Sequence, residues 1–540
     1  MNDLETNPSK ALIATLFLGG VAGAVTLAIS GTGEAMEDAA IHLAMAKNFW
    51  SEGFFSLTQG TPAGAVTSPL WVFLEALILG PTGSPEVTVT VLSLFTYGLF
   101  SWSLWKLLEG HSRELALITL LLAWVSGPFQ WHLWSGMETL LFAGFVLGAL
   151  DATLRKEDLK SGLWAGAAIL TRMEGILLLG VIGLALWRRF RAGEPPKTNH
   201  ALGMGFGVAA FGLFGLINWA HTGHFMPTTG AGKRFLYGIM WHGVDAIPIV
   251  HTRVMHLVED WILFMGGAYG KNGIFGLFWL SVLALPLGYW TFWKARSSQV
   301  GILLFWCVIL TGVYALELPV RDVAGRYQSL NLLLLPIGMA GAVLGASSIH
   351  RMLGALLLVL FLVQQGSTVL PWAHARHTQH EHLESVHREA GLWIQQNNPE
   401  CKPIILGEIG WISYENKQAS CPAPIRDYYA LADPEYFREA SAGKAFSAAL
   451  NPGDEGIFAL SMLSTNLPSV HLRLRFPDGE PGTWKQGETY TAIEETTERK
   501  FRFHLVKRFS YSFPENPKYK HPAGRITGMN PLLVGRIQAQ

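Results

Sequence analysis

The chain has 540 residues, of which 50% are apolar and only 15% are charged, against roughly 25% charged residues in soluble domains. Its 40 basic and 40 acidic residues cancel, so the net charge offers no electrostatic footprint for nucleic acid. The charges are unevenly spread, because 38 of the 80 fall in the last 168 positions. This composition excludes an ordinary soluble enzyme and indicates a membrane-embedded part followed by a soluble domain.

From the N-terminus onward, uncharged apolar runs recur that are long enough to cross roughly 30 Å of hydrocarbon. They lie at 11–30, 86–107, 114–130, 137–154, 201–220, 271–293, 299–318, 330–348 and 352–372. A further stretch, 161–187, is too long for one span, is interrupted at 171–175 and has basic residues on both flanks. Because basic flanks stay in the cytoplasm, we predict a hairpin of two short helices there, and about eleven spans in all.

The basic residues of the short loops decide the predicted orientation. If the spans alternate, these residues all fall on one side, which should be cytoplasmic together with the N-terminus. The first loop, 31–85, and everything after 372 are then expected on the outer face of the cell inner membrane. The apolar segment 68–80 is too short to span, so we expect it to lie in or along the membrane within this loop.

Polar and charged residues gather on the predicted outer face, where a membrane environment makes them candidates for a functional site. The candidates are Glu37, Asp38 and His42 after the first run, Glu138 at the start of a span, Arg172 and Glu174 in the hairpin, Lys233 and Arg234 in an outer loop, and Arg326 and Tyr327 before a later span. A few acids with several cations suit an amphiphile that carries phosphate.

These residues also have a purely structural interpretation. Asp38 could cap the helix that follows it, and Glu138 could simply favour the N-terminal end of a helix dipole. Arg172 and Glu174 could be an ion pair that holds the hairpin together, and Arg326 could be an anchor at the leaflet boundary. The residues alone leave both interpretations open.

The order of the polar segments and the residues in them resemble the sequence motifs of the GT-C superfamily of glycosyltransferases that use polyprenyl-phosphate sugars. The similarity is greatest to the branch that contains mycobacterial arabinofuranosyltransferases. That branch carries an acidic pair followed by Ala, then Thr-Ser-Pro-Leu-Trp, Gly-Met-Glu-Thr, Thr-Arg-Pro-Glu-Gly and a Leu-Pro-Asn-Thr-like turn with a Lys beyond, here at 37–39, 67–71, 136–139, 171–175, 226–229 and Lys233. The chain departs from this pattern at Glu37, Met173 and Thr228, where the branch has Asp, Pro and Asn.

The resemblance implies an inverting transferase in which Asp38 acts as the general base, with Glu37 in a supporting role. It implies phosphate ligands at Lys233, Arg234, Arg326 and Arg172, and supporting roles for Glu138, Glu174, His42 and Tyr327. Arabinofuranose is the first expectation for the sugar, and the acceptor is expected to be a glycan or a protein. A polytopic transporter or flippase of a lipid-linked glycan is the alternative, although no inverted repeat with paired broken helices is apparent.

No metal or cofactor is indicated. Histidines crowd the stretch 374–387, and two of them at helical spacing could hold a metal. They lack a cysteine or a tight acidic partner, so a solvated helix next to the membrane is the preferred interpretation. A divalent metal is compatible with the sequence but is not indicated by it, and no Walker-type glycine-rich loop for a nucleotide is present.

The chain divides into a membrane module, 1–372, and a soluble domain, 373–540, that reads as an extracytoplasmic α+β domain. A helical run near 382–396 is followed by strand-like patterns at 402–406, 470–476 and 501–506. Cys401 and Cys421 lie twenty residues apart in this domain, and an oxidising compartment would let them form a disulfide. The fold class predicted is therefore a polytopic α-helical membrane protein with a C-terminal α+β domain.

Overall fold

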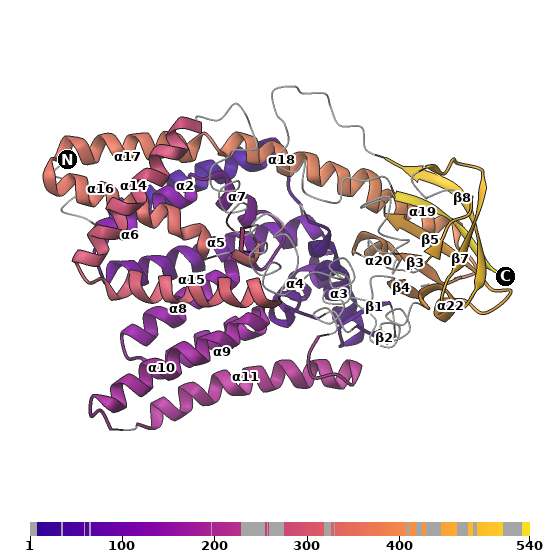
Figure 1. Cartoon of the computed structure of the whole chain (residues 1–540), viewed down its shortest axis with the longest axis horizontal. Helices are drawn as coiled ribbons and strands as arrows, with labels where there is room; N and C mark the ends of the chain where they lie inside the picture. The colour runs from indigo at the N-terminus through magenta and orange to yellow at the C-terminus, as the bar shows by residue number, and fades with distance from the viewer. Residues whose placement is uncertain are drawn as a thin grey trace.

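The computed structural model consists of a body of long helices at one end and a β-sheet, formed by the C-terminal part of the chain, at the opposite end (Figure 1). It describes residues 8–227, 275–317, 326–406, 410–416, 424–427, 444–461, 474–478, 483–510 and 532–540, together with Val254, Met255 and Val258, but without positions 34, 35, 59, 64, 65, 196 and 329.

Six described helical segments are long and apolar enough to cross a membrane, and a seventh is obtained if one bent pair counts as a single span. The long segments include α2 (Pro8–Ser30), α5 (Pro85–Glu109), α11 (Thr198–Thr222), α15 (Ser298–Glu317), α16 (Leu334–Ile349) with the 3-10 turn η3 (Asn331–Leu333) before it, and the continuous segment Arg351–Asn397, which begins with α17 (Arg351–Gly366). The bent pair is α6 (Arg113–Trp124) and α7 (Gly127–Leu133), which meet at 75°.

The count of about eleven spans is not confirmed. One predicted span, 137–154, is the helix α8 (Thr139–Leu154), which has 16 residues. At 1.5 Å per residue, such a helix is shorter than the hydrocarbon layer. The multi-pass helical architecture is present, and within the described part of the chain α8 is shorter than the span predicted there.

The predicted hairpin is found. The helix α9 (Asp158–Thr171) and the helix α10 (Leu177–Arg191) are joined by a 3-10 turn, η1 (Met173–Ile176). The open end of the hairpin is closed by an ion pair in which Arg189 Nη1 lies 2.6 Å from Asp158 Oδ1. The start of α9 and the end of α10 therefore lie together, and the interruption at Arg172 forms the opposite tip of the hairpin.

The first loop folds into two helices and a small hairpin. They are α3 (Glu37–Glu52), β1 (Ser56–Thr58), β2 (Thr61–Pro62) and α4 (Pro69–Thr82). The predicted short apolar segment 68–80 is α4, which buries Trp71, Val72, Ala76 and Leu79. It packs against α3 and so helps to position the residues at the start of that helix.

After α17 the chain remains helical and passes into the C-terminal part without an intervening strand. The segments are α18 (Val369–His382), the π-helical turn η4 (Leu383–Arg388) and α19 (Glu389–Asn397), so the predicted helix near 382–396 is present. Together with α17 they form one continuous helical segment, 351–397. The C-terminal part is thus attached to the membrane body through a helix rather than a loop.

A seven-stranded mixed sheet forms the C-terminal part, in the order β4-β3-β5-β9-β8-β7-β6. Its strands are β3 (Ile404–Leu406), β4 (Ile425–Asp427), β5 (Glu455–Ser461), β6 (Leu474–Arg475), β7 (Thr489–Glu494), β8 (Arg499–Phe509) and β9 (Leu532–Ala539). The strands β4, β3 and β5 pair in parallel, and the others pair antiparallel. The short helices α20 (Gly410–Asn416) and α22 (Ala445–Ala449) connect the parallel strands.

One hydrophobic core joins the first loop to the C-terminal part. It contains Leu43 of α3 and Val72 of α4 as well as Val386 of η4, Ile404 of β3 and Trp411 of α20. Burial of apolar surface on this scale makes the contact an integral part of the fold. The division predicted at residue 372 therefore crosses a continuous helix and a shared core.

Candidate functional site

Asp38 lies in the first turn of α3 and forms an ion pair with the guanidinium of Arg326. The residue at the N-cap position is Met36, and it makes no side-chain capping hydrogen bond. The side chain of Asp38 is therefore directed to a cation from a distant segment rather than serving as the N-cap. Its side chain is 43% exposed, whereas that of Arg326 is 9% exposed.

Arg326 lies in the 3-10 turn η2 (Arg326–Gln328), which precedes α16. Its Nη2 donates to the hydroxyl of Tyr327 at 2.7 Å, and its guanidinium lies 4.8 Å from the centre of the Tyr327 ring. Its buried Nε has no hydrogen-bond partner among the described residues. The predicted site residues Asp38, Arg326 and Tyr327 therefore form one cluster.

A second cluster surrounds Arg172 at the tip of the hairpin. Its Nη1 donates to Glu138 Oε1 at 2.7 Å, and its Nη2 donates to Glu174 Oε1 at 3.2 Å and to the Tyr314 hydroxyl at 3.3 Å. Tyr314 in turn donates to Glu174. Arg172 and Glu174 thus form an ion pair, and hydrogen bonds connect this pair to Glu138, which precedes α8, and to Tyr314 of α15.

The two clusters meet at Tyr327. The centre of its ring lies 5.3 Å from the guanidinium carbon of Arg172 and 4.8 Å from the guanidinium carbon of Arg326. The same point lies 5.3 Å from the centre of the Tyr314 ring. An aromatic ring between two cations holds both by cation–π attraction. Asp38, Arg326, Arg172, Glu138 and Glu174 are in this way parts of one connected polar site.

His42 connects α3 to the second cluster. It lies four residues after Asp38, so both side chains fall on one face of the helix. Its Nδ1 is 3.8 Å from Glu138 Oε2, and neither buried atom has a hydrogen-bond partner in the described part of the chain. Burial lowers the pKa of His42 below its usual 6.5, partly opposed by the negative charges of Glu138 and Asp38.

Glu37 points away from this site. Its Oε1 accepts from the backbone amides of Gly410 at 2.7 Å and Trp411 at 3.3 Å, and its Oε2 lies 3.0 Å from His387 Nδ1. Neighbouring residues on a helix do not face each other, so the acidic pair divides between two partners. Glu37 holds the start of α3 to α20 and η4, while Asp38 faces Arg326.

Three predicted residues cannot be placed. Lys233, Arg234 and Cys421 lie outside the described residues, so the phosphate contacts of the two cations and the disulfide between Cys401 and Cys421 stay predictions. Within the described ranges, no group of three or more His, Cys, Asp or Glu side chains is arranged to hold a metal ion. The histidine-rich stretch is helical, with His377 beside Glu381 at 3.2 Å.

The sequence did not single out Arg376, which is fully buried on α18. Its guanidinium donates to the backbone oxygens of Trp134 at 3.0 Å, of Gly31 at 2.7 Å and of Gly33, and to the Ser30 hydroxyl at 2.5 Å. These acceptors lie just upstream of Asp38 and Glu138 in the chain. Arg376 thus fixes both backbone segments that lead into the site, and its position directly after the last apolar run does not by itself distinguish it from a solvated cation.

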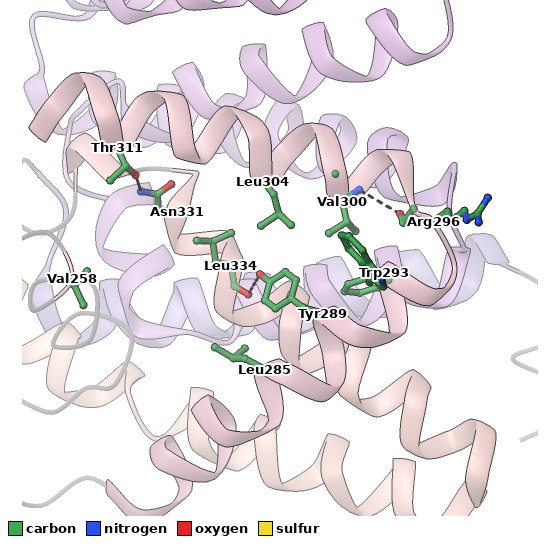
Figure 2. Close-up of a pocket in the computed structure, with 13 residues that line it drawn as sticks. Val258, Leu285, Tyr289, Trp293, Arg296, Val300, Leu304, Thr311, Asn331 and Leu334 are labelled. Atoms are coloured by element: carbon green, nitrogen blue, oxygen red, sulfur yellow. Dashed lines mark hydrogen bonds between the residues drawn. The ribbon is translucent and has the colours of Figure 1, made fainter. Parts of the chain in front are cut away.

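Tyr314 was also missed, because it lies inside a run that hydropathy marks only as a span. An apolar cavity of about 1020 Å³ opens along the same helix, between α14 (Phe275–Lys294), α15 and the start of α16 (Figure 2). It extends from Trp293 and Arg296 to Thr311 and Asn331, whose side chains are hydrogen-bonded at 2.8 Å. Tyr314 follows Thr311 by one helical turn, so the cavity ends close to the polar site.

Neither a protein-family model nor a curated protein matches the chain. Among solved structures, ArnT from Cupriavidus metallidurans, crystallised with undecaprenyl phosphate, has a TM-score of 0.53 and 13% identity over 97% of both chains. The apo oligosaccharyltransferase of Archaeoglobus fulgidus has a TM-score of 0.51 and 11% identity, over 84% of this chain and 71% of that one. The mycobacterial arabinofuranosyltransferase AftD reaches a TM-score of 0.41 at 13% identity, over 97% of this chain and 40% of its own.

The similarity to ArnT and to the oligosaccharyltransferase confirms the GT-C fold that the sequence motifs predict. The confirmed features are a multi-pass helical membrane body and a β-rich C-terminal part. Identities of 11 to 13% establish the fold alone. The chemistry has to be argued from the side chains of this chain, since function depends on the site rather than on the fold.

Proposed function

We propose that this protein is a glycosyltransferase that moves a sugar from a polyprenyl-phosphate donor to an acceptor hydroxyl. The observation that carries the proposal is a partly exposed carboxylate, Asp38, beside the buried guanidinium of Arg326, near the end of a large apolar cavity. A base, a cation and an apolar cavity are the three elements that transfer from a lipid phosphate requires. The GT-C fold and the bound undecaprenyl phosphate of ArnT support this assignment.

In this mechanism Asp38 accepts the proton of the acceptor hydroxyl while the hydroxyl oxygen attacks the anomeric carbon. The bond from that carbon to the phosphate oxygen breaks on the opposite side, so the configuration inverts. Negative charge builds on the departing phosphate, and preorganised cations stabilise it most in the transition state. Arg326 lies beside the base and is assigned to this phosphate, with Lys233 and Arg234 as further predicted ligands.

The second cluster is assigned to the sugar. Glu138 and Glu174 flank Arg172, and Tyr314 offers a hydroxyl at the same place. Carboxylates and hydroxyls that are themselves held by hydrogen bonds are suited to orient sugar hydroxyl groups. His42 and Tyr327 position these groups relative to Asp38.

The apolar cavity is assigned to the lipid chain of the donor. It is lined mainly by aliphatic and aromatic side chains from α14, α15 and α16 (Figure 2), and burial of each methylene contributes about 0.8 kcal/mol. The polar end near Thr311 and Asn331 would then place the phosphate toward Arg326.

The finer features follow the sequence predictions. We assign the protein to the inner membrane, with a cytoplasmic N-terminus and an extracytoplasmic C-terminal domain, and we place the site at the outer face. Arabinofuranose is the first candidate for the donor sugar, and a glycan, lipid or protein carries the acceptor hydroxyl. The C-terminal part, which packs on α3, covers the site or recognises the acceptor.

The decisive experiment measures release of free polyprenyl phosphate from a radiolabelled lipid-linked sugar by the purified protein with an acceptor. Arabinofuranose and hexose donors are tested in parallel, with Asp38→Asn as the matched inactive control. Release that depends on protein, acceptor and Asp38 supports the proposal. Movement of the intact lipid-linked glycan across vesicles without cleavage would instead identify a flippase.

A further inference from the structure

The ion pair between Asp38 and Arg326 joins two groups that the proposed reaction needs apart. Asp38 has to accept a proton, and Arg326 has to bind a phosphate. A carboxylate that accepts hydrogen bonds from a guanidinium is a weaker base, because its charged form is stabilised. In the same way, a guanidinium beside a carboxylate attracts a second anion less strongly.

The burial of the two partners differs, and this determines which of them can move. Arg326 is 9% exposed, and Tyr327 holds it by a hydrogen bond of 2.7 Å and by ring contact. Asp38 has a side chain that is 43% exposed, so water can solvate its carboxylate when it leaves the pair. Asp38 is therefore the mobile partner, and Arg326 is the fixed one.

Arg326 also has one buried hydrogen-bond donor that no acceptor among the described residues uses. Its Nη1 donates to Asp38 and its Nη2 to Tyr327, whereas its buried Nε has no hydrogen-bond partner in the part of the chain that the structure describes. A buried donor without an acceptor is destabilising, and in native proteins such a group calls for an explanation. An anion that reaches Nε removes this penalty and competes with Asp38 for the same positive charge.

We propose that the pair of Asp38 and Arg326 is a latch that the phosphate of the donor opens. The phosphate binds at the guanidinium of Arg326, takes the unused Nε donor and displaces the carboxylate of Asp38. The freed carboxylate then turns to the acceptor hydroxyl, so the donor binds before the acceptor. This inference rests on the proposed function and adds to it the order of binding and the control of the base.

The latch lowers the apparent affinity for the phosphate. When a binding-competent state is populated for a fraction of the time, the dissociation constant rises by the inverse of that fraction. A latch that is open about one-tenth of the time weakens phosphate binding about tenfold. Removing the charge of Asp38 should recover this factor, even though the same change abolishes turnover.

The first test compares the affinity of the purified full-length protein for undecaprenyl phosphate in wild type, Asp38→Asn and Glu37→Gln. Asp38→Asn should bind about tenfold more tightly. The matched control removes an equal charge one residue away, but Glu37 is held by α20 and His387, so its loss should leave the affinity within about twofold. Equal affinities in wild type and Asp38→Asn, or an equal gain in both variants, would overturn the latch.

The second test uses the wild-type chain, so its result does not depend on how a variant folds. Carbodiimide coupling of an amine to Asp38 is quantified by mass spectrometry with and without undecaprenyl phosphate, and Glu37 serves as the internal reference. Coupling at Asp38 should rise several-fold with the lipid, while coupling at Glu37 stays constant. Binding with unchanged coupling at Asp38 overturns the latch alone, whereas absence of binding in every variant overturns the proposed function as well.

Discussion

Asp38→Asn separates chemistry from stability at one position. Asn keeps the size of the side chain and an oxygen that can still accept from Arg326, but it has no carboxylate to take up a proton. Loss of a positioned general base lowers turnover by about 10²–10⁴-fold. The structural cost is small, because a hydrogen bond to a charged group is worth about 1.5–3 kcal/mol and a neutral one about 1 kcal/mol. Since Asp38 is 43% exposed, solvent screening leaves a difference of about 1 kcal/mol.

The assay pairs the rate of polyprenyl phosphate release with the melting temperature in detergent. We expect a collapse of transfer together with a shift of only about 2 °C in melting temperature. Asp38→Ala, which also removes the accepting oxygen, should lose the same activity and somewhat more stability. Near wild-type turnover in a well-folded Asp38→Asn protein would refute the assignment of the base and direct attention to Glu138, a buried acid near His42.

The remaining predictions concern packing, topology, covalent structure and pH. Arg172→Ala should lower the free energy of unfolding by about 3 kcal/mol, since it leaves buried carboxylates without their cation; an unchanged denaturation midpoint would contradict this. A reporter fused after Gln540 should be active only outside the cytoplasm, and cytoplasmic activity would reverse the orientation. Protein isolated without reductant should contain one disulfide between Cys401 and Cys421, worth about 3 kcal/mol in the entropy model, which a mass showing free thiols would exclude. Because burial lowers the pKa of His42, the unfolded chain takes up this proton first. The stability that neutral His42 contributes is therefore complete above about pH 6.5 and falls as the pH drops below it, a dependence that His42→Gln should reduce in melting curves.

The helical body was predictable because its signal is local. Runs of apolar residues mark helices wherever water is excluded, and the hairpin at 161–187 follows from the length of the run, its interruption at 171–175 and its basic flanks. The lengths of the spans were not predictable in the same way. The helices α8 and α10 have 16 and 15 residues, and where such helices begin and end depends on partners such as Asp158 and Glu138 that the apolar pattern does not reveal.

The predicted site residues were brought together only in part. Asp38, Arg326, Arg172, Glu138 and Glu174 do form one connected site, because charged groups that are buried, as Arg326, Arg172 and Glu138 are, require partners of opposite charge. Residues that hold the site were harder to identify. Tyr314 is one hydroxyl inside an apolar span, and Arg376 acts on backbone oxygens, so neither has a local pattern that distinguishes it from a core residue or a solvated cation.

The substitution of Glu for Asp at position 37 has a physical reading in this fold. The Glu37 carboxylate contacts two amides of α20 and His387 of η4, and an Asp side chain would be one methylene shorter. The longer side chain therefore reaches a segment of the C-terminal part that an Asp at this position would approach less closely. Because Asp38 is the next residue on the same helix, any shift of α20 or η4 is transmitted to the first turn of α3. The C-terminal part therefore contacts the residue next to the candidate base, while Asp38 itself pairs with Arg326 of the segment before α16.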